Sequence, residues 1–569
     1  MLFRASQDAL MIRRRRILAV IVVLIALFSL VSPPLLSLWR WQVSIEPAID
    51  LRDLAWAPGG GIGLTILVGL VGWGLIRGKR QAWWLTVASV VLSLLSSILE
   101  RSHWLSLAFS VIVLLSLLWC APLFPSRSDP RSLLHGYLAF GLSAICLLST
   151  GLFLSLVPHG TRIVAFMSRR EVLTGLHLLA ILFLSYGLSA LLQPVRGPRT
   201  APESSERMRA RTVLSREGRL SLGHFVLGED KHYFWSTTGR SFLAYVVHAG
   251  VALVLGEPIG PESERKEFLR AFLHYCQCRD WSPALYQAGL TTTQECRTLG
   301  WRAYKIGEEA ILDLNTFTLQ GKKGAAVRHM LARAKRANIS ISCWQGVTIP
   351  EHIFTGMQHV STAWKHDQQI AQQMRFSMSC FPENWSPDLL TVVACDAGGE
   401  VQAFLTWTPI YATRGWALDL IRRSKTAAPG TIESLIVESL EWARNHGTTH
   451  LSLGLAPLAG LSGETERRPG SVLERGAAWL HQRGLLLGQY RSLRAFKAKF
   501  QPDWQERYLI VQERMALPKV VFALAWIQGY TWKTLLYQGA SCLHAFPRRH
   551  RGHLPLSASD DLRTKGEAT

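Results

Sequence analysis

The sequence predicts a multi-pass α-helical membrane domain followed by an α/β (α+β) region built from two modules. Its 569 residues exceed what one hydrophobic core accommodates, so several folding units are expected. Long apolar runs fill the first third, whereas short strands alternate with amphipathic helices after Leu192. The formal net charge is +22 although 49% of the residues are hydrophobic. This combination argues against a simple soluble enzyme and favours a membrane protein that meets polyanions, such as anionic lipid head groups or nucleic acid.

The membrane domain is expected to cover residues 1–195 with about six transmembrane helices. The runs long enough to cross hydrocarbon are Ile17–Trp39, Gly61–Ile76, Ala82–Leu99, Trp104–Phe124, Leu133–Val157 and Val172–Leu192. Basic residues cluster on alternate loops, which puts both termini in the cytoplasm by the positive-inside rule. The external loop with Arg162, Arg169 and Arg170 is a mild contradiction. Few ionisable residues lie inside the runs, which favours anchoring over ion transport.

Composition divides the rest of the chain. Residues 196–219 are rich in Pro, Ser and Arg and predict a basic linker that lies against the anionic inner leaflet or is simply solvated. The remaining segments are a first module at 220–320, a basic connecting helix at 321–340, a second module at 341–515, and an amphipathic helix with a polar tail at 516–569. In the last of these, Pro518–Ala540 either lies in the membrane interface or packs against the second module.

Strands and helices alternate in two series, which indicates two α/β modules rather than one large sheet. The first series has strands at Phe242–His248, Val251–Leu255, Ala284–Gln287 and Ile311–Leu314 around a helix at Glu262–Arg279. The second has helices at Glu351–His366 and Ile432–Asn445 and strands at Leu390–Cys395, Val401–Pro409, Arg414–Leu418 and His450–Leu455. Between them, Leu319–Ile339 predicts a helix whose charges, Lys323 and Arg328 among them, either track RNA phosphates or face solvent.

No motif points to a metal or to a redox cofactor. The nine cysteines are scattered, and Cys276 and Cys278 form only a C-x-C pair, which matches neither a zinc site nor a disulfide framework. The stretch HLSLG at His450–Gly454 differs from a nucleophile elbow because histidine replaces the first glycine. We therefore expect reduced thiols, no metal and no cofactor.

Several motifs occur in a specific order: KIGEEAILDL within Lys305–Ile339, ALDLIRR at Ala417–Arg423, LSLGLAPLAGL at Leu451–Leu461 and SLRAFKAKFQPDWQERYL at Ser492–Leu509. Together with the LVLGEPIGP turn at Leu253–Pro261, this set resembles the catalytic domain of the aminoacyl-phosphatidylglycerol synthases, the lysyl-phosphatidylglycerol synthase or multiple peptide resistance factor family. The resemblance implies two tandem GNAT-like acyltransferase modules, the second of them catalytic.

The implied reaction moves an aminoacyl group, with lysine as the favoured donor, from aminoacyl-tRNA to the glycerol hydroxyl of phosphatidylglycerol. This would lower the negative charge of a bacterial inner membrane and raise resistance to cationic antimicrobial peptides. The implied partners are aminoacyl-tRNA, phosphatidylglycerol and the anionic membrane, with flipping done here or by a separate flippase. The identity of the amino acid and the oligomeric state stay open.

Asp419 and Arg422, at the end of a predicted strand, are the first catalytic candidates. A carboxylate there can bind the α-ammonium of the aminoacyl group or deprotonate the acceptor alcohol. The planar guanidinium of Arg422 can clamp a phosphate or the ester carbonyl. Alternatively, the two residues form a local ion pair. Glu308 and Glu309 would face opposite sides of a strand, so only one of them can point into the site. Glu308 joins the catalytic candidates by resemblance, and the alternative for both is an ion pair with the basic helix that follows.

Other candidates would bind substrate. Lys497, Lys499 and Arg494 can hold a lipid phosphate or the acceptor end of tRNA, unless they form a solvated basic face. Glu433 stands where the family usually has aspartate. The substrate-binding set is completed by residues of the basic helix, Lys323 and Arg328.

The chain departs from the family pattern in three places. RFSMSCF at Arg375–Phe381 replaces the usual Phe-Ser-Leu-Gly motif, and Ile432-Glu433 replaces a Met-Asp pair. Long bifunctional members also have more membrane spans. Only Pro429-Gly430 precedes the following helix, unlike the glycine-rich loop of acyl-CoA enzymes. The alternatives are a GNAT-like N-acyltransferase acting on another membrane substrate and a non-enzymatic lipid transporter or flippase.

Overall fold

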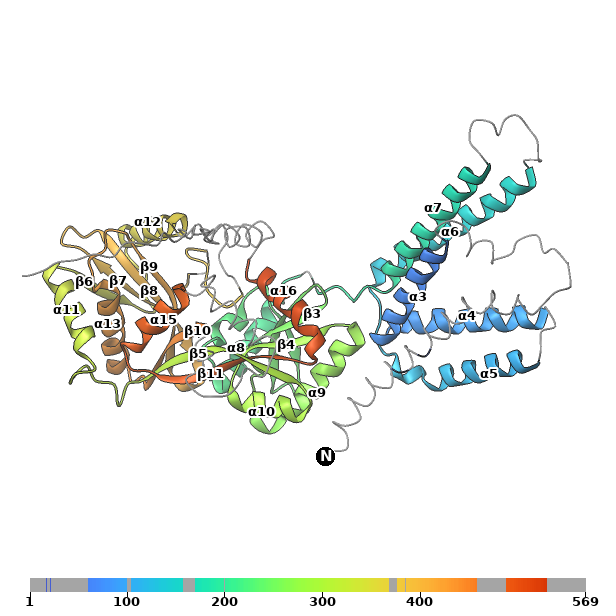
Figure 1. The fold of residues 1–569 in the computed structure, drawn as a ribbon. Helices are drawn as coiled ribbons and strands as arrows, with labels where there is room; N and C mark the ends of the chain where they lie inside the picture. The colour runs from blue at the N-terminus through green and yellow to red at the C-terminus, as the bar shows by residue number, and fades with distance from the viewer. Residues whose placement is uncertain are drawn as a thin grey trace, which may run out of the picture. The chain divides into compact units, whose positions relative to one another are not determined.

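The computed structural model describes residues 60–99, 104–156, 169–198, 200–367, 376–383, 385–457 and 488–529, together with residues 17 and 21 (Figure 1). The first predicted span, Ile17–Trp39, and the end of the predicted helix Pro518–Ala540 fall mostly outside these residues.

Five α-helices of the N-terminal part lie within residues 60–191 of the described chain, and each corresponds to one of the predicted apolar runs. They are α3 (Gly60–Ile76), α4 (Arg80–Leu99), α5 (Trp104–Trp119), α6 (Pro130–Leu156) and α7 (Arg169–Leu191). The helices α6 and α7 lie side by side (Figure 1), and a Cβ added to Gly187 would lie 3.1 Å from the carbonyl oxygen of Gly136. Small residues at this interface therefore allow the close approach that is typical of helices packed in a membrane.

Only one helical segment in the described part of the chain is long and apolar enough to cross a membrane, Pro130–Thr150 of α6. Three further apolar segments, Leu67–Ile76, Ser110–Trp119 and Gly175–Leu191, are shorter. The finding is thus one candidate span, where the sequence predicted about six.

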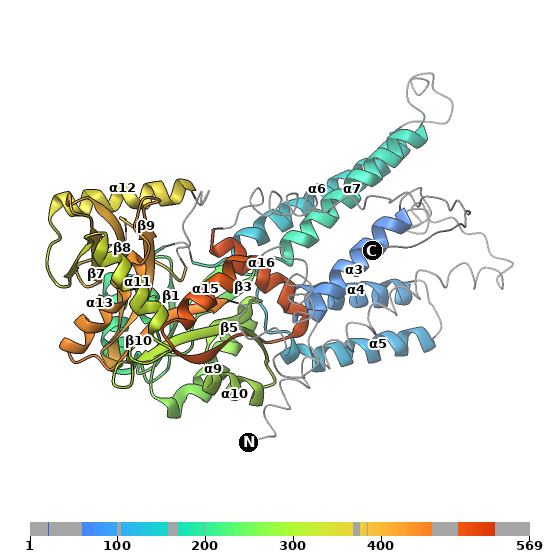
Figure 2. The same ribbon diagram turned by 60° about the vertical axis from the view of Figure 1, so that its left-hand side comes forward.

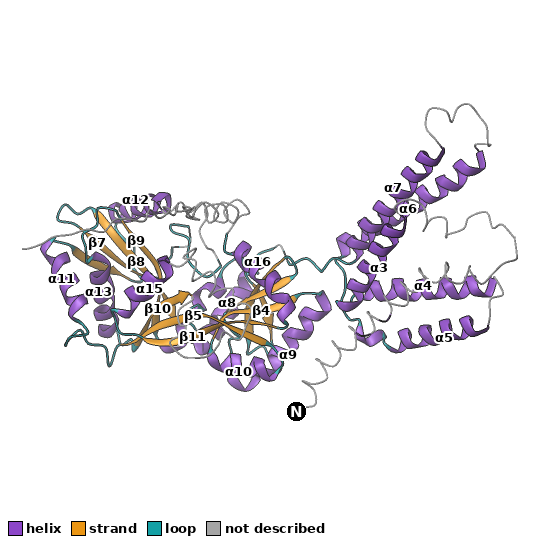
Figure 3. Cartoon of the chain, in the orientation of Figure 1, coloured by secondary structure: helices purple, strands orange, loops and turns teal. Residues whose placement is uncertain are grey.

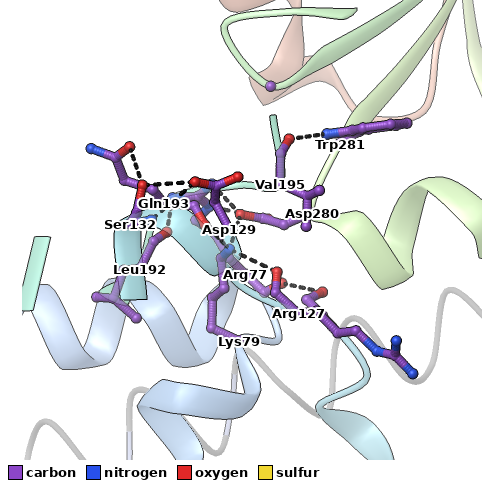
Figure 4. Close-up of polar contacts among 12 residues, drawn as sticks. Arg77, Lys79, Arg127, Asp129, Ser132, Leu192, Gln193, Val195, Asp280 and Trp281 are labelled. Atoms are coloured by element: carbon purple, nitrogen blue, oxygen red, sulfur yellow. Dashed lines mark hydrogen bonds and ion pairs between the residues drawn. The ribbon is translucent and has the colours of Figure 1, made fainter. Parts of the chain in front are cut away.

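A buried polar junction joins the helical part to the α/β region (Figure 4). Lys79 follows α3 and is fully buried; its Nζ donates to the carbonyl oxygens of Gln193 at 2.7 Å and Arg127 at 3.2 Å and lies 3.0 Å from Oδ2 of Asp280. Desolvation lowers the pKa of Lys79 to about 8. The backbone N–H groups of Arg127 and Val195 donate to carbonyls in the last turn of the helix that precedes Asp280. The carbonyl oxygens of Gln193 and Arg127 and the carboxylate of Asp280 thus provide acceptors for all three ammonium protons of Lys79.

The α/β region is one continuous sheet of 11 strands in the order β1-β2-β3-β4-β11-β5-β10-β9-β8-β7-β6 (Figure 3). The strands are β1 (His232–Trp235), β2 (Phe242–His248), β3 (Val251–Leu255), β4 (Ser282–Ala288), β5 (Arg302–Asp313), β6 (Ser340–Trp344), β7 (Leu390–Cys395), β8 (Val401–Ile410), β9 (Gly415–Arg423), β10 (His450–Pro457) and β11 (Asp503–Val511). The expectation of two modules rather than one large sheet was therefore wrong, because β11 inserts between β4 and β5 and joins the two halves.

Helices cover both faces of each half. In the first half, α9 (Glu262–Arg279) and α10 (Leu290–Thr298) cover one face, and α8 (Ser204–Glu217) and α16 (Leu517–Ile527) cover the other. In the second half, α11 (Ala325–Arg336), α13 (Thr431–Asn445) and α15 (Gly488–Ala498) pack on one face, and α12 (Glu351–Asp367) packs on the other. The helices α11 and α13 are in contact (Figure 2).

Two segments differ from the sequence prediction. The predicted linker at 196–219 contains α8, which buries Ala210 and Leu214 and so belongs to the folded core. The helix α16 buries Val520 and Ala523 against β2 and β3, in the first half of the sheet rather than against the second module. In both cases a few apolar residues at helical spacing dock a segment that composition alone described as polar or interfacial.

Candidate functional site

The parallel pair β9–β10 opens partway along its length. The two strands are paired only at Leu451 with Trp416 and at Ser452 with Ala417, although both continue further. Beyond Ser452, β10 shifts register against β5, and Gly454 adopts φ +79°, a value that favours glycine. In the first half of the sheet, by contrast, β3 and β4 stay paired throughout Val251–Leu255. The opening in the second half exposes backbone groups between two adjacent strands, which is where a reactive group can be admitted.

Asp419 lies at this opening and is the extra residue of a β-bulge. The ladder between β8 and β9 pairs Thr406 with Leu420 and Trp407 with Leu418, so Asp419 has no partner. Asp419 and Arg422 are three residues apart, and in a regular strand such residues point to opposite faces. The bulge re-aims the carboxylate, which accepts hydrogen bonds from the N–H of Ser379 at 3.0 Å and from Thr406 Oγ1 at 3.2 Å. Asp419 and Arg422 therefore both lie on the face that α12 covers.

Asp419 is partly buried, and desolvation of its carboxyl group raises its pKa above the ordinary value, against the opposing effects of the Ser379 and Thr406 hydrogen bonds and of the Arg422 charge. A carboxylate shifted in this direction is better matched to accepting a proton near neutral pH.

Arg422 is also buried, with its guanidinium carbon 3.9 Å from the centre of the Trp364 ring of α12. Its Nη1 donates to the carbonyl oxygen of Ile421 at 3.1 Å, whereas Nε has no hydrogen-bond partner within the described residues. Burial lowers the pKa of Arg422 to about 10. The described part of the chain contains no ion pair between Arg422 and Asp419, so the guanidinium keeps donors for an anion or a carbonyl oxygen.

Lys497 reaches into the strand opening from α15. Only 4% of the residue is exposed, and its Nζ donates to the carbonyl oxygens of Gly454 at 2.9 Å and Leu455 at 2.8 Å. Burial lowers the pKa of Lys497 to about 7, with Glu309 opposing the shift. The ammonium thus satisfies the two β10 carbonyls that the opening leaves without a partner on β9.

The two glutamates at the centre of β5 point to opposite faces. Glu308, chosen on the sequence, pairs with Lys305 at 2.8 Å and with Arg494 of α15 at 3.2 Å. Glu309 is buried and accepts hydrogen bonds from Ser452 and Arg507. The alternative of an ion pair with the basic helix is not what the structure shows, because the charged partners of both glutamates, Lys305, Arg494 and Arg507, lie on β5, α15 and β11. Among the described residues, Glu309 is the carboxylate whose charge acts on Lys497.

A cavity of about 510 Å³ lies beside the start of α13. Its lining residues are Met330, Trp364, Ile421, Arg423, Ala427, Ala428, Pro429, Gly430, Thr431, Ile432, Glu433 and Phe496. At its wall Glu433 pairs with Lys499 at 3.0 Å. Gly430 has φ +97°, and a Cβ there would lie 2.0 Å from the carbonyl oxygen of Met330. This glycine is therefore required by the packing of α11 on α13.

The structure brings some predicted residues together and leaves others apart. Asp419 and Arg422 share the face that α12 covers, and Lys497 enters the strand opening from α15. Arg494 contacts Glu308, and Lys499 contacts Glu433. Lys323, in the turn before α11, is exposed. Arg328, in the first turn of α11, donates to the carbonyl oxygen of Gly321 at 2.9 Å. No group of three or more His, Cys, Asp or Glu side chains that could hold a metal occurs in the described ranges.

Sequence reasoning missed three groups that shape the site, Ser379, Thr406 and Trp364, and it weighed Glu309 but preferred Glu308. The N–H of Ser379 is a backbone donor and has no sequence signature. Thr406 lies within an apolar strand pattern, where a polar residue that is fully buried could have been noticed. Strand alternation allowed only one of Glu308 and Glu309 to point into the site, and it did not decide which one.

The sheet is mixed and contains two β-α-β units, one of them opened beside a half-buried carboxylate and a buried lysine, and this arrangement defines a protein with a GNAT-like fold. A family model described as "Phosphatidylglycerol lysyltransferase, C-terminal" matches residues 211–511. The chain belongs to this family.

The relatives and solved structures agree with this assignment. The chain is 30% identical over 315 residues to a lysylphosphatidylglycerol biosynthesis bifunctional protein of Mycobacterium avium, covering 54% of this chain and 26% of the relative. It is 30% identical over 310 residues to the phosphatidylglycerol lysyltransferase of Staphylococcus aureus, covering 54% and 36% respectively. The structure of L-PGS from Bacillus licheniformis matches with a TM-score of 0.51 and 26% identity, covering 59% of this chain and 99% of that one. The chain thus spans about a quarter to a third of the length of these curated relatives.

Proposed function

We propose that this protein transfers an aminoacyl group, lysyl in the first place, from aminoacyl-tRNA to the glycerol hydroxyl of phosphatidylglycerol at the inner leaflet. The observation that carries the proposal is the opened β9–β10 pair with the half-buried Asp419 beside it, in a chain of the phosphatidylglycerol lysyltransferase family. The product head group of lysyl transfer changes from about −1 to about +1 in charge, which weakens the attraction of cationic antimicrobial peptides to the membrane.

The reaction exchanges one ester for another. The glycerol oxygen attacks the ester carbonyl of the lysyl-tRNA, its proton is removed, and the terminal ribose oxygen of the tRNA leaves and takes up a proton. The ester is already activated, so the chain has to position the two reactants, deprotonate the acceptor hydroxyl and stabilise the oxyanion that forms. Asp419 suits the proton transfer or the α-ammonium, Arg422 suits a phosphate or the oxyanion, and Lys497, with a pKa of about 7, can hold a proton near neutral pH.

The helical part supports a multi-pass membrane anchor. Long apolar side chains on α4, α5, α6 and α7 are exposed, for example Leu92, Ile112, Leu148 and Leu182, as expected for helices surrounded by lipid. Arg77, Lys79 and Arg127 lie at the ends that contact the α/β region. Basic residues mark the cytoplasmic side of spans, so we infer that the α/β region lies in the cytoplasm, where charged tRNA is available.

The helix α11 is the element we assign to tRNA. It and the turn before it carry exposed basic side chains at Lys322, Lys323, Arg328, Arg333, Lys335 and Arg336. On the same helix, Met330 lines the cavity beside α13. A phosphate-tracking face next to a cavity suits the acceptor end of a tRNA, and its binding should weaken steeply as salt rises.

The proposal is tested by expressing the chain in a bacterial host that lacks aminoacylated lipids and identifying the extracted lipids by mass spectrometry. A lysyl-phosphatidylglycerol product is expected, and its mass reports which amino acid is transferred. Asp419→Asn and Arg422→Ala should abolish it, whereas Asp388→Asn should not, because Asp388 forms an exposed pair with Arg211. All variants should insert into the membrane equally.

A product on a different amine or alcohol would instead support an N-acyltransferase. Lipid redistribution without any new lipid would support a transporter or flippase. Full activity of both site variants would show that the chemistry lies elsewhere in the chain.

A further inference from the structure

The segment Phe376–Phe381 bridges the two halves of the sheet. Both of its terminal phenylalanines are fully buried, Phe376 at 0% and Phe381 at 1% exposure. Phe376 belongs to a hydrophobic cluster of the first half, and Phe381 belongs to the cluster beneath α12 in the second half. Between them, Ser379 donates its N–H to Asp419. We call this segment the strap.

The first end of the strap rests on Lys231. The ring of Phe376 lies 6.1 Å from that of Tyr286, and the Nζ of Lys231 is 4.8 Å from the centre of the Phe376 ring. Lys231 is completely buried, and its ammonium pairs with Asp230 at 2.6 Å. A desolvated ammonium held over an aromatic ring is the favourable case of a cation–π contact. Phe376 therefore has a fixed position in the first half.

The second end of the strap is equally fixed. The ring of Phe381 lies 5.0 Å from Phe404 of β8 and 5.4 Å from Phe354 of α12, and its carbonyl oxygen accepts from Lys365 Nζ at 3.0 Å. Only four residues lie between the two anchored phenylalanines. Movement of Phe376 is therefore transmitted along the strap to the Ser379 N–H.

We propose that Phe376 and Lys231 are positioning residues for the reaction: from the half of the sheet that stays closed, they hold the Ser379 N–H on the carboxylate of Asp419. The inference rests on the proposed function in so far as Asp419 acts in aminoacyl transfer. A hydrogen bond from a backbone N–H stabilises the ionised carboxylate. Its loss raises the pKa of Asp419 beyond the upward shift that burial already causes, so less of the ionised form is present at low pH.

The test uses the full chain in lipid nanodiscs that contain phosphatidylglycerol, with lysyl-tRNA as donor, and follows kcat/KM against pH. In Phe376→Leu we expect the acid limb of the profile to move to higher pH by about one unit. On that limb the activity of the variant should fall about tenfold below wild type, and the two profiles should converge on the alkaline side. Lys231→Met removes the ammonium but retains an unbranched apolar side chain, and it should move the acid limb in the same direction.

Phe272→Leu is the matched control. Phe272 of α9 is also fully buried in the first half, but it belongs to the cluster on the opposite face from Phe376. This variant should lose stability without a change in the pH profile. Identical profiles for Phe376→Leu, Lys231→Met and Phe272→Leu would overturn the inference.

Hydrogen exchange gives a readout that does not depend on activity. The peptide containing Ser379 should exchange faster in Phe376→Leu and Lys231→Met than in wild type, and unchanged exchange would also overturn the inference. If wild type makes no lysyl lipid, the proposed function fails, and exchange still decides whether the strap holds Asp419.

Discussion

Replacing Lys497 by methionine tests how the strand opening is stabilised. The pKa of Lys497 is about 7 in the folded protein, against 10.5 for a lysine side chain in water. Between these values the unfolded chain binds a proton that the folded chain does not, so the free energy of unfolding rises with pH. From pH 7 to pH 9 this contributes about 2 kcal/mol. Below pH 7 both states are protonated, and the full desolvation cost of the ammonium remains.

Lys497→Met removes this pH-dependent contribution and leaves the carbonyl oxygens of Gly454 and Leu455 without their donor, a loss that does not depend on pH. The melting temperature of wild type minus that of the variant should therefore increase by about 5 °C between pH 7 and pH 9, measured by differential scanning fluorimetry in detergent. Phe496→Leu, on the same helix, removes packing but no titratable group and should give the same difference at both pH values. A pH-independent difference for Lys497→Met would refute the assigned burial of its charge.

Two further substitutions test packing away from the opening. Asp280→Asn keeps a residue that tolerates the left-handed backbone at φ +59° but removes the carboxylate that pairs with both Lys79 and Arg77. We expect thermal denaturation to show a loss of about 3–5 kcal/mol in unfolding free energy, and the double variant with Lys79→Met should restore the part that comes from the buried ammonium. Gly430→Ala places a Cβ 2.0 Å from the carbonyl oxygen of Met330 and should cost more than about 3 kcal/mol and most activity, whereas Gly447→Ala, at φ +70° with no atom within 4 Å, should cost about 1 kcal/mol.

Local patterns predicted most elements of the fold but not how the halves join. Four predicted boundaries, those of Phe242–His248, Val251–Leu255, Glu262–Arg279 and Leu390–Cys395, match the structure. Residues Arg302–Ala310 of β5 and all of β11 were missed because their apolar residues alternate with charged ones at the centre of the sheet, where Glu309 and Arg507 satisfy each other. Pairing between β4 and β11 joins residues far apart in sequence, and such pairing has no local signature.

The candidate site shows the same division between local and non-local information. Asp419 and Arg422 were chosen as charges at the end of an apolar strand, which is a local signal. Their common face depends on a bulge that appears only in the pairing with β8. Glu308 and Glu309 point to opposite faces of β5, and the sequence does not say which face α15 covers. In the folded chain α15 covers the face of Glu308, which pairs with Arg494.

The same β-α-β unit occurs twice in this sheet, and its two copies differ in how the parallel strands meet. In the first copy, after β3, Glu257 accepts from the N–H of Gly289 at 3.1 Å, and the strands stay paired. In the second copy, Gly454 turns β10 out of register, and Lys497 occupies the gap. An opened pair exposes backbone groups and would by itself be weak, so it needs rigid neighbours. Because β11 and β5 continue the sheet directly into the closed copy, the half without an opening supports the half that holds Asp419.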